Sequence, residues 1–327
     1  MRVIDSHTEG EPTRVILSGG PDLGAGSLAE RAERLGRDHA DFCASVVQEP
    51  RGSDALIGAL LVPPSRPDCA AGVIYFNTVG NLGMCGHASI GTAVTLAHLG
   101  QIAPGLHGLE TPVGVVEVAL HSDHEASITN VESYRLHKDV TVEVDGLGAV
   151  KGDIAYGGNW FFLSRDLPCA LDYANLRHLN DATLRIRAAL EAQGWTGSCG
   201  AWIDHIILLG PSDTADARNY VLCPGGSHDR SPCGTGSSAL LACMAADGQL
   251  GEGEAWVQES IIGSQYRLHF RRGSEGGVIP TSRGRAWVMA EADLCFAPTD
   301  PYAAGIRAAA DPPREGCRRP QTRAPAP

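Results

Sequence analysis

The sequence lacks an excess of positive charge and has no long apolar run. Its 26 lysine and arginine residues stand against 38 aspartate and glutamate residues, a formal net charge of −12. That balance argues against nucleic acid or an anionic membrane surface as a partner. No apolar stretch approaches the roughly 20 residues that span a membrane. Charged residues near the start interrupt any signal-peptide core, so we expect a cytoplasmic protein with no membrane partner.

The sequence also lacks the spacings typical of metal and dinucleotide sites. Its 10 cysteines include no Cys-x-x-Cys pair and its histidines no His-x-x-x-His pair, so no metal site is expected. No Gly-x-Gly-x-x-Gly segment joins a strand pattern to a helix pattern, which argues against a dinucleotide fold. Scattered cysteines without a secretion signal argue against a disulfide framework. Most of the cysteines are predicted to be small buried residues, namely Cys43, Cys69, Cys169, Cys199, Cys223, Cys243 and Cys295.

Two further cysteines each begin a similar short motif. Cys85 begins Cys-Gly-His-Ala-Ser-Ile-Gly, and Cys233 begins Cys-Gly-Thr-Gly-Ser-Ser-Ala. Small and apolar residues follow both, and they predict helices over about 86–99 and 234–247. Unpaired backbone N–H groups at a helix start lower the pKa of a thiol placed there. We therefore expect each thiol to titrate at about pH 7–8, which suits general acid–base catalysis.

A pair of such thiols predicts proton exchange on two faces of one carbon. One thiolate would remove a proton while the other thiol delivers one from the opposite side, which inverts the carbon. The free amides of Gly86, His87, Gly234 and Thr235 predict a carboxylate site between the two helix starts. Together these features indicate an α-amino or α-imino acid substrate. Two further polar residues, Asp229 for the substrate nitrogen and His205, complete the candidate site.

Each candidate also has a purely structural interpretation. Either cysteine alone could be a buried structural thiol, and only the paired context favours catalysis. Asp229 could instead pair with Arg230 or cap a turn. His205 lies in an apolar strand pattern, where a satisfied core histidine is the alternative to a ligand.

The order of strand and helix patterns repeats at the scale of a domain. Each half of the chain shows strands, a loop, a Cys-Gly pair, a helix ended by glycine, and further strands. Short strands with few helices predict an α+β fold rather than a doubly wound sheet. We predict one domain over 1–130 with about 280–307, a second over 131–279, hinges near 131–140 and 276–284, and a disordered tail over 308–327.

The motifs resemble those of the proline racemase family, and within it the 4-hydroxyproline 2-epimerases. The resemblance extends to about residue 306. Its matching segments include the N-terminal Gly-Glu-Pro-Thr-Arg, both Cys-Gly motifs and a late Gly-Ser-Gln, and they lie at 4–8, 10–14, 49–52, 84–87, 110–114, 157–162, 203–206, 229–236 and 263–265. The chain departs from the family pattern after each Cys-Gly pair, at Ala88, Ser89 and Ser237, which bears on the ring substituent accepted.

The resemblance implies a cofactor-independent enzyme made of two pseudo-symmetric α+β halves. Each half would wrap a β-sheet or barrel around a central helix, with the active site in the cleft between the halves. It implies that Cys85 and Cys233 are the acid–base residues. It also places the remaining candidates at substrate-contacting positions, namely Gly86, His87, His205, Asp229, Gly234 and Thr235.

The implied reaction converts trans-4-hydroxy-L-proline to cis-4-hydroxy-D-proline. His87 after the first Cys-Gly favours a hydroxylated ring, and the presence of both cysteines argues against a trans-3-hydroxyproline dehydratase. Proline racemisation and 3-hydroxyproline epimerisation stay open. So do two other classes of function, a thiol redox sensor that uses the two cysteines as a disulfide pair and a non-catalytic amino-acid binder. A homodimer also stays open.

Overall fold

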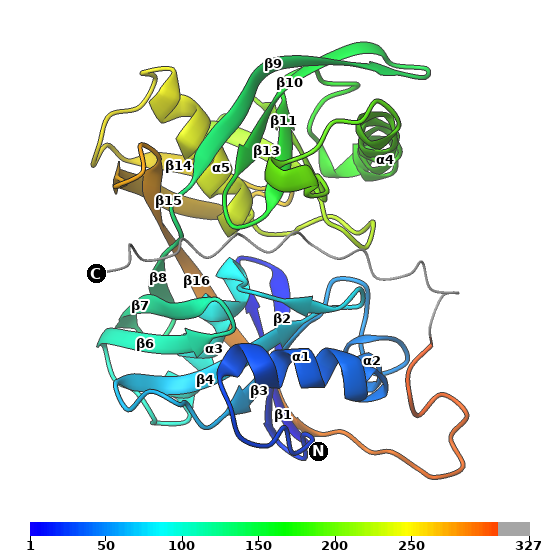
Figure 1. Ribbon diagram of the computed structural model, residues 1–327, viewed down its shortest axis with the longest axis vertical. Coiled ribbons are helices and arrows are strands. Elements are labelled where there is room, and N and C mark those ends of the chain that lie inside the picture. The colour runs from blue at the N-terminus through cyan, green and yellow to red at the C-terminus, as the bar shows by residue number, and fades with distance from the viewer. Residues whose placement is uncertain (307–327) are drawn as a thin grey trace, which may run out of the picture.

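The computed structural model describes residues 1–306, and two halves lie one above the other along its long axis (Figure 1). The predicted tail over 308–327, with Cys317, lies outside the described residues. Within residues 1–306, no helix is long and apolar enough to cross a membrane.

The first half is a closed ring of strands around one helix. In order round the ring these are β1 (Arg2–Thr8), β2 (Glu11–Ser18), β3 (Ile57–Val62), β4 (Cys69–Phe76), β6 (Gly105–Thr111), β7 (Gly114–Ser122), β8 (Glu125–Thr129) and β16 (Val278–Asp293). Because β16 pairs with both β8 and β1, the ring has no free edge. Helix α3 (Gly86–His98) is buried over most of its length, whereas α1 (Leu28–Asp38) and α2 (Ala40–Val47) keep exposed residues; the two-residue β5 (Asn81–Leu82) pairs with β4.

The second half repeats this plan around another helix. Its strands are β9 (Tyr134–Val144), β10 (Gly148–Tyr156), β11 (Trp160–Ser164), β12 (His205–Gly210), β13 (Ala217–Leu222), β14 (Trp256–Glu259) and β15 (Gln265–Arg272), followed by the start of β16. Helix α5 (Gly234–Ala246) is almost wholly buried, and α4 (Leu176–Ala192) buries one side only. Two short 3₁₀ turns, η1 (Tyr173–Asn175) and η2 (Ser198–Gly200), complete the described elements.

Strand pairing shows the pseudo-symmetry directly. From β1 through β4 and β6 to β8, successive pairs are antiparallel, parallel, antiparallel, parallel, antiparallel and antiparallel. The same order runs from β10 to β16. Helices α3 and α5 fall at equivalent places, after β5 and β13 respectively. The predicted α+β fold of two similar halves, each built around a central helix, is therefore confirmed.

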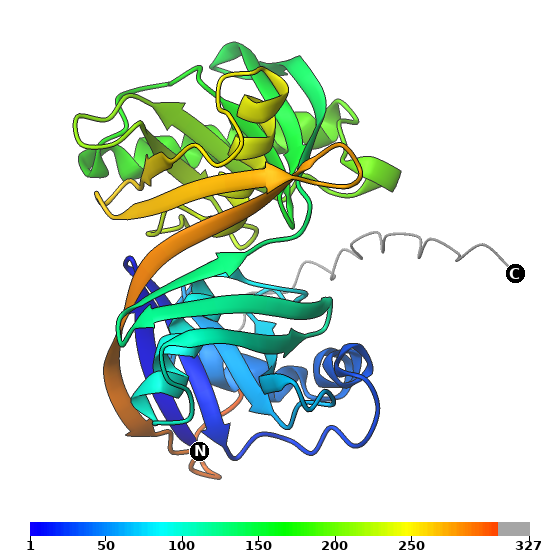
Figure 2. The same ribbon diagram turned by 90° about the vertical axis from the view of Figure 1, so that its left-hand side faces the viewer.

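The two halves are joined at two neighbouring places. Strand β16 pairs with β15 over 278–283 and with β1 over 286–293, so it crosses from one half to the other (Figure 2). The segment between β8 and β9 crosses in the opposite direction, and Ser133 within it exchanges two backbone hydrogen bonds with Val278, of 2.7 and 2.9 Å. The predicted hinges fall at these crossings, and hinge motion and the exact domain boundaries stay predictions.

Some local predictions were wrong for identifiable reasons. The helix pattern over 27–41 is two helices, because α1 begins at a Ser27 capping box and ends at His39, where α2 starts in a new direction. Strand β6 was not predicted, since its two glycines and its histidine give a weak strand signal. Among the cysteines predicted to be buried, Cys199 and Cys295 are exposed, and Cys169 and Cys223 are partly exposed.

Candidate active site

The two central helices begin next to each other, one from each half. A Cβ placed on Gly86 would lie 3.4 Å from the Cα of Gly234, and one placed on Gly234 would lie 3.5 Å from the Cα of Gly86. Glycine at both positions lets the backbones come this close while leaving room beside them. The two Cys-Gly motifs are therefore brought together by the fold.

A pocket lies where the helix starts meet, between the two halves. Every residue predicted for the site lines it, namely Cys85, Gly86, His87, His205, Asp229, Cys233, Gly234 and Thr235. Both cysteines are buried, with relative exposures of 9% for Cys85 and 4% for Cys233. The same pocket thus receives side chains from α3, from the start of β12, from α5 and from the loop before α5.

The amides at the helix starts precede the hydrogen-bonded part of each helix. The first helical bonds run from Ser89 N to Cys85 O, at 2.9 Å, and from Ser237 N to Cys233 O, at 2.8 Å. The N–H groups just before these donors have no carbonyl within their own helix to bind. They include the four predicted amides, and such groups are well suited to holding a carboxylate.

Cys85 lies beside an imidazole as well as beside the N–H groups of its own helix start. Its backbone is extended, with φ −139° and ψ 120°, and its Sγ lies 3.5 Å from His87 Nδ1. Burial, together with the negative charge of Asp229, raises the pKa of the Cys85 thiol to about 12. Hydrogen bonds from N–H groups of the helix start lower this pKa but do not outweigh burial. Burial also lowers the pKa of His87, which favours the neutral ring.

Cys233 has a different backbone and different neighbours. Its φ of 63° and ψ of 103° lie in a region that residues other than glycine rarely adopt. In this conformation Sγ accepts a hydrogen bond from Gly236 N at 3.4 Å and lies 3.7 Å from Thr235 Oγ1. Burial, followed by the negative charge of Asp229, raises the pKa of Cys233 well above its ordinary value.

The expected pKa of about 7–8 is therefore wrong for both thiols, because burial raises both pKa values instead of lowering them. A helix start stabilises a thiolate by about 0.3–1 kcal/mol, up to about 2 when partly buried. Removing a thiolate from water in a pocket that also holds carboxyl groups opposes ionisation more strongly. Burial and the neighbouring acidic side chains therefore favour neutral thiols.

Asp229 is a buried pocket residue held by its own loop. Its Oδ1 accepts hydrogen bonds from both the N–H and the Oγ of Ser231, each at 2.8 Å, and Ser231 Oγ accepts the Cys233 N–H at 3.2 Å. Asp229 therefore caps a turn, as one alternative had it. It does not pair with Arg230, whose Nη1 donates to His228 O at 2.7 Å.

His205 stands at the start of β12 and faces the pocket with one side. Its Nδ1 lies 2.7 Å from Asp204 Oδ1, and its ring centroid lies 4.6 Å from that of Phe161. The residue is thus both packed and pocket-lining, which combines the two interpretations made from the sequence.

Sequence reasoning missed several residues that line the pocket. Glu11 belongs to the N-terminal Gly-Glu-Pro-Thr-Arg segment, for which no role in the site was predicted. Cys223 was grouped with the structural cysteines, although it follows β13 and precedes the loop that carries Asp229. The segments themselves were visible in the sequence, but nothing local in them indicates that they meet the Cys-Gly motifs.

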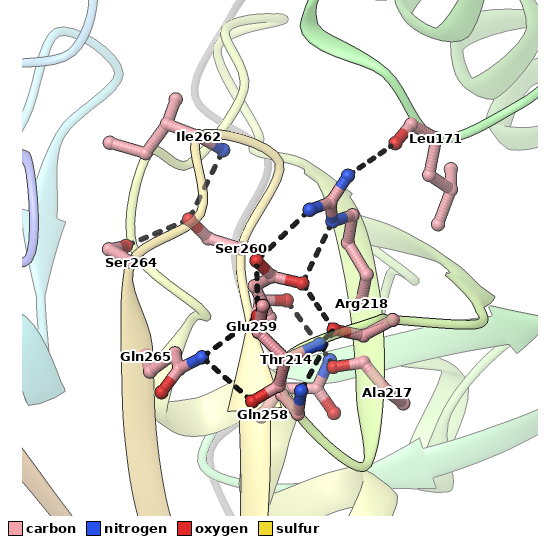
Figure 3. A network of polar contacts seen from close by, with 12 residues as sticks. Leu171, Thr214, Ala217, Arg218, Gln258, Glu259, Ser260, Ile262, Ser264 and Gln265 are labelled. Carbon is pink, nitrogen blue, oxygen red and sulfur yellow. Dashed lines mark hydrogen bonds and ion pairs between the residues drawn. The ribbon is translucent and has the colours of Figure 1, made fainter.

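Outside the pocket, an ion pair between the partly exposed Arg218 and the buried Glu259 supports the short pairing of β13 with β14 (Figure 3). Glu259 accepts two hydrogen bonds from Arg218, both at 3.0 Å, and further bonds from Thr214 and Ser212. Arg218 also donates to the carbonyl of Leu171 at 3.2 Å. Burial by itself raises the pKa of Glu259, but these donors outweigh it and lower the pKa.

The turn after β14 links this network to the pocket loop. Ser260 and Ser264 are joined through their Oγ atoms at 2.8 Å (Figure 3). Ser264 Oγ also donates to the carbonyl of Arg230, at 3.2 Å. Arg230 is next to Asp229, so the network braces the loop that carries the predicted nitrogen acceptor.

Within residues 1–306, no group of three or more His, Cys, Asp or Glu side chains is arranged to hold a metal ion. The arrangement instead offers two thiols, a set of helix-start amides and acidic side chains around one small pocket. Thiols and carboxyl groups are side chains that can take up and release protons.

Comparisons with known proteins agree over almost the whole chain. A family model described as proline racemase matches residues 3–307. A 4-hydroxyproline 2-epimerase of Roseibium aggregatum is 65% identical over 309 residues, 94% of this chain and 100% of that protein. A protein of the same name from Pseudomonas aeruginosa is 54% identical over 310 residues, 94% of this chain and 99% of that protein.

A solved structure gives the same result for the fold. It is that of a hydroxyproline epimerase from Agrobacterium vitis with bound trans-4-hydroxy-L-proline. It superposes with a TM-score of 0.85 at 25% sequence identity and covers 94% of both chains.

Proposed function

The chain belongs to the proline racemase family, and from this premise we propose that it epimerises 4-hydroxyproline at Cα, interconverting trans-4-hydroxy-L-proline and cis-4-hydroxy-D-proline without a cofactor. The observation that carries the proposal is the meeting of two Cys-Gly helix starts, one from each half, in one pocket. The names of the relatives and the ligand of the Agrobacterium vitis structure support this choice of substrate.

Two thiols carry the reaction in this proposal. One cysteine, as thiolate, takes the proton from Cα, and the other, as thiol, gives its proton to the opposite face, so the carbon is inverted. The roles exchange for the reverse direction. Because burial raises the pKa of Cys85 to about 12, its thiolate is a strong base once formed. A cationic substrate nitrogen in the same pocket would offset the negative charge that opposes ionisation.

The helix-start amides hold the substrate carboxylate. Negative charge builds on that carboxylate as the Cα proton leaves, and the N–H groups of Gly86, His87, Gly234 and Thr235 stabilise it there. Asp229 accepts a hydrogen bond from the N–H of the substrate ring. The imidazole of His87, next to Cys85, is the group proposed to hydrogen-bond with the ring hydroxyl. Burial of the whole site keeps water from the carbanion-like intermediate.

The test is a solvent-exchange assay in heavy water. We expect trans-4-hydroxy-L-proline to gain deuterium at Cα while its optical rotation changes toward that of the epimeric mixture. If no proline derivative exchanges, the epimerase proposal fails. Binding without exchange would favour an amino-acid binder, and a Cys85–Cys233 disulfide that alters partner binding would favour a redox sensor.

The family description keeps proline itself as the second candidate substrate. The third is 3-hydroxyproline, which the sequence left open. Comparing kcat/KM for the three ring acids in the same assay ranks them. A higher kcat/KM for proline than for trans-4-hydroxy-L-proline would make the protein a proline racemase.

A further inference from the structure

A second buried carboxyl group in the pocket, that of Glu11, has no role in the mechanism above. Glu11 begins β2 in the first half and is 3% exposed, and it lines the same pocket as Asp229 of the second half, which is 5% exposed. Its Oε2 accepts a hydrogen bond across the two halves from Arg230 N, at 2.7 Å. Among the described residues, Oε1 of Glu11 accepts no hydrogen bond.

Each of the two carboxyl groups thus keeps one oxygen that can accept a hydrogen bond from a ligand N–H group. Oδ1 of Asp229 is taken by two bonds from Ser231, and Oε2 of Glu11 by the bond from Arg230. The other oxygen of each group accepts no N–H bond among the described residues, although the Cys233 thiol also interacts with the Asp229 carboxyl. Two acidic groups buried near each other are unfavourable without a cation between them. In agreement, burial and then the negative charge of Asp229 raise the pKa of Glu11 well above its ordinary value.

The substrate supplies a cation with a matching number of donors. The ring nitrogen of a prolyl amino acid is a secondary amine, so its protonated form carries two N–H bonds that point in different directions. We propose that Asp229 and Glu11 each accept one of these N–H bonds, which makes Glu11 a substrate-binding residue contributed by the opposite half. This inference rests on the proposed function and deepens it, because the substrate nitrogen then ties the two halves together.

The first experiment compares Glu11→Gln with Glu9→Gln. Glu9 lies in the same turn and is also buried, but it binds Arg285 and does not line the pocket, so it is a matched control. We expect Glu11→Gln to raise the KM for trans-4-hydroxy-L-proline roughly 10- to 100-fold, with a smaller change in kcat, because a hydrogen bond to a charged partner is weakened. Glu9→Gln should leave KM unchanged. An unchanged KM in Glu11→Gln would overturn the inference.

A second measurement separates nitrogen binding from a merely structural role. Tetrahydrofuran-2-carboxylate has the ring and the carboxylate but an ether oxygen in place of the nitrogen, so it offers neither N–H nor charge. Its inhibition constant should be the same for the wild type and Glu11→Gln. A rise equal to the rise in KM would mean that Glu11 only shapes the loop at Arg230, and the inference would be wrong.

A crystal structure of the Cys85→Ser variant with trans-4-hydroxy-L-proline gives the direct answer. The ring nitrogen should lie within hydrogen-bond distance of both Glu11 and Asp229, and contact with Asp229 alone would contradict the inference. Failure of the proposed function is distinguishable, since it appears as absent Cα exchange in the wild type. Normal wild-type exchange with an unaffected Glu11→Gln would remove only the role of Glu11.

Discussion

The two halves present the same Cys-Gly motif to one pocket, yet they present two different thiols. Cys85 has an extended backbone and an imidazole beside its sulfur. Cys233 has a positive φ, and its sulfur accepts a backbone N–H from its own helix. The pseudo-symmetric fold therefore brings one thiol from each half to the same pocket, and the backbone conformation and flanking residues make the two thiols distinct.

The difference arises from what precedes each cysteine. The carbonyl of Pro232 accepts bonds from Asn219 Nδ2, at 2.8 Å, and from Ser237 Oγ, at 3.0 Å, which holds Cys233 in its unusual conformation. The loop that carries Asp229 and the Ser264–Arg230 hydrogen bond that holds this loop belong to the same half. The second half thus contributes the hydrogen-bonded Asp229 loop to the pocket, whereas the first half contributes His87.

Replacing either thiol should have the largest effect on the comparison. We expect Cys85→Ser and Cys233→Ser each to lower kcat by about 10²–10⁴-fold, the range typical of a lost acid–base group. The exposed Cys199 offers a control, and Cys199→Ser should keep full activity. Full activity in either pocket variant, measured by polarimetry, would show that the two-thiol mechanism is wrong.

Removing the charge of Glu259 should show how much the Arg218–Glu259 network of the second half contributes to the stability of the protein. Glu259→Gln leaves Arg218 without its buried partner, and we expect the free energy of unfolding in urea to fall by about 1–3 kcal/mol. Glu291→Gln, at the exposed pair with Arg2 in the first half, should change it by about 0–1 kcal/mol. Equal losses in the two variants would remove the proposed asymmetry.

Raising the pH should destabilise the fold through its buried thiols. The pKa of Cys85 is raised from 9.0 to about 12, so its contribution to stability is fully present below about pH 9 and is lost as the pH rises to about 12. In that window each such group lowers the unfolding free energy by about 1.4 kcal/mol per pH unit. Cys85→Ser should have a shallower slope in urea titrations, and Cys199→Ser an unchanged one. An equally steep slope in Cys85→Ser would contradict the burial argument.

Replacing the residue after each Cys-Gly pair by alanine should have the smallest effect. It tests directly whether the two halves contact different parts of the substrate. His87→Ala should reduce the preference for 4-hydroxyproline over proline by about 2- to 10-fold, the value of one neutral hydrogen bond. Thr235→Ala, at the equivalent position of α5, should lower kcat/KM for both substrates alike. If Thr235→Ala changes the preference and His87→Ala does not, the ring hydroxyl is bound by the second half and not by the first.

Predictions from the sequence succeeded where the signal is local. Helices α3 and α5 follow from runs of small and apolar residues ended by Gly100 and Gly248, and the repeated order of strands indicated two halves. They failed where position depends on distant segments. Nothing near Glu11 or Cys223 shows that each meets the Cys-Gly motifs, and the direction of the thiol pKa depends on burial by both halves.

The sequence by itself determined the pair of helix-start thiols, the amides beside them and the family resemblance. These depend on backbone hydrogen bonding and residue spacing over a few turns, and any fold that keeps the helices keeps them. Only the tertiary structure decided that the helix starts touch at Gly86 and Gly234, that β16 is shared by both halves, and that Glu11 shares a pocket with Asp229. The physical reason is that solvent exclusion and electrostatic interaction act through space, between residues that the chain keeps far apart.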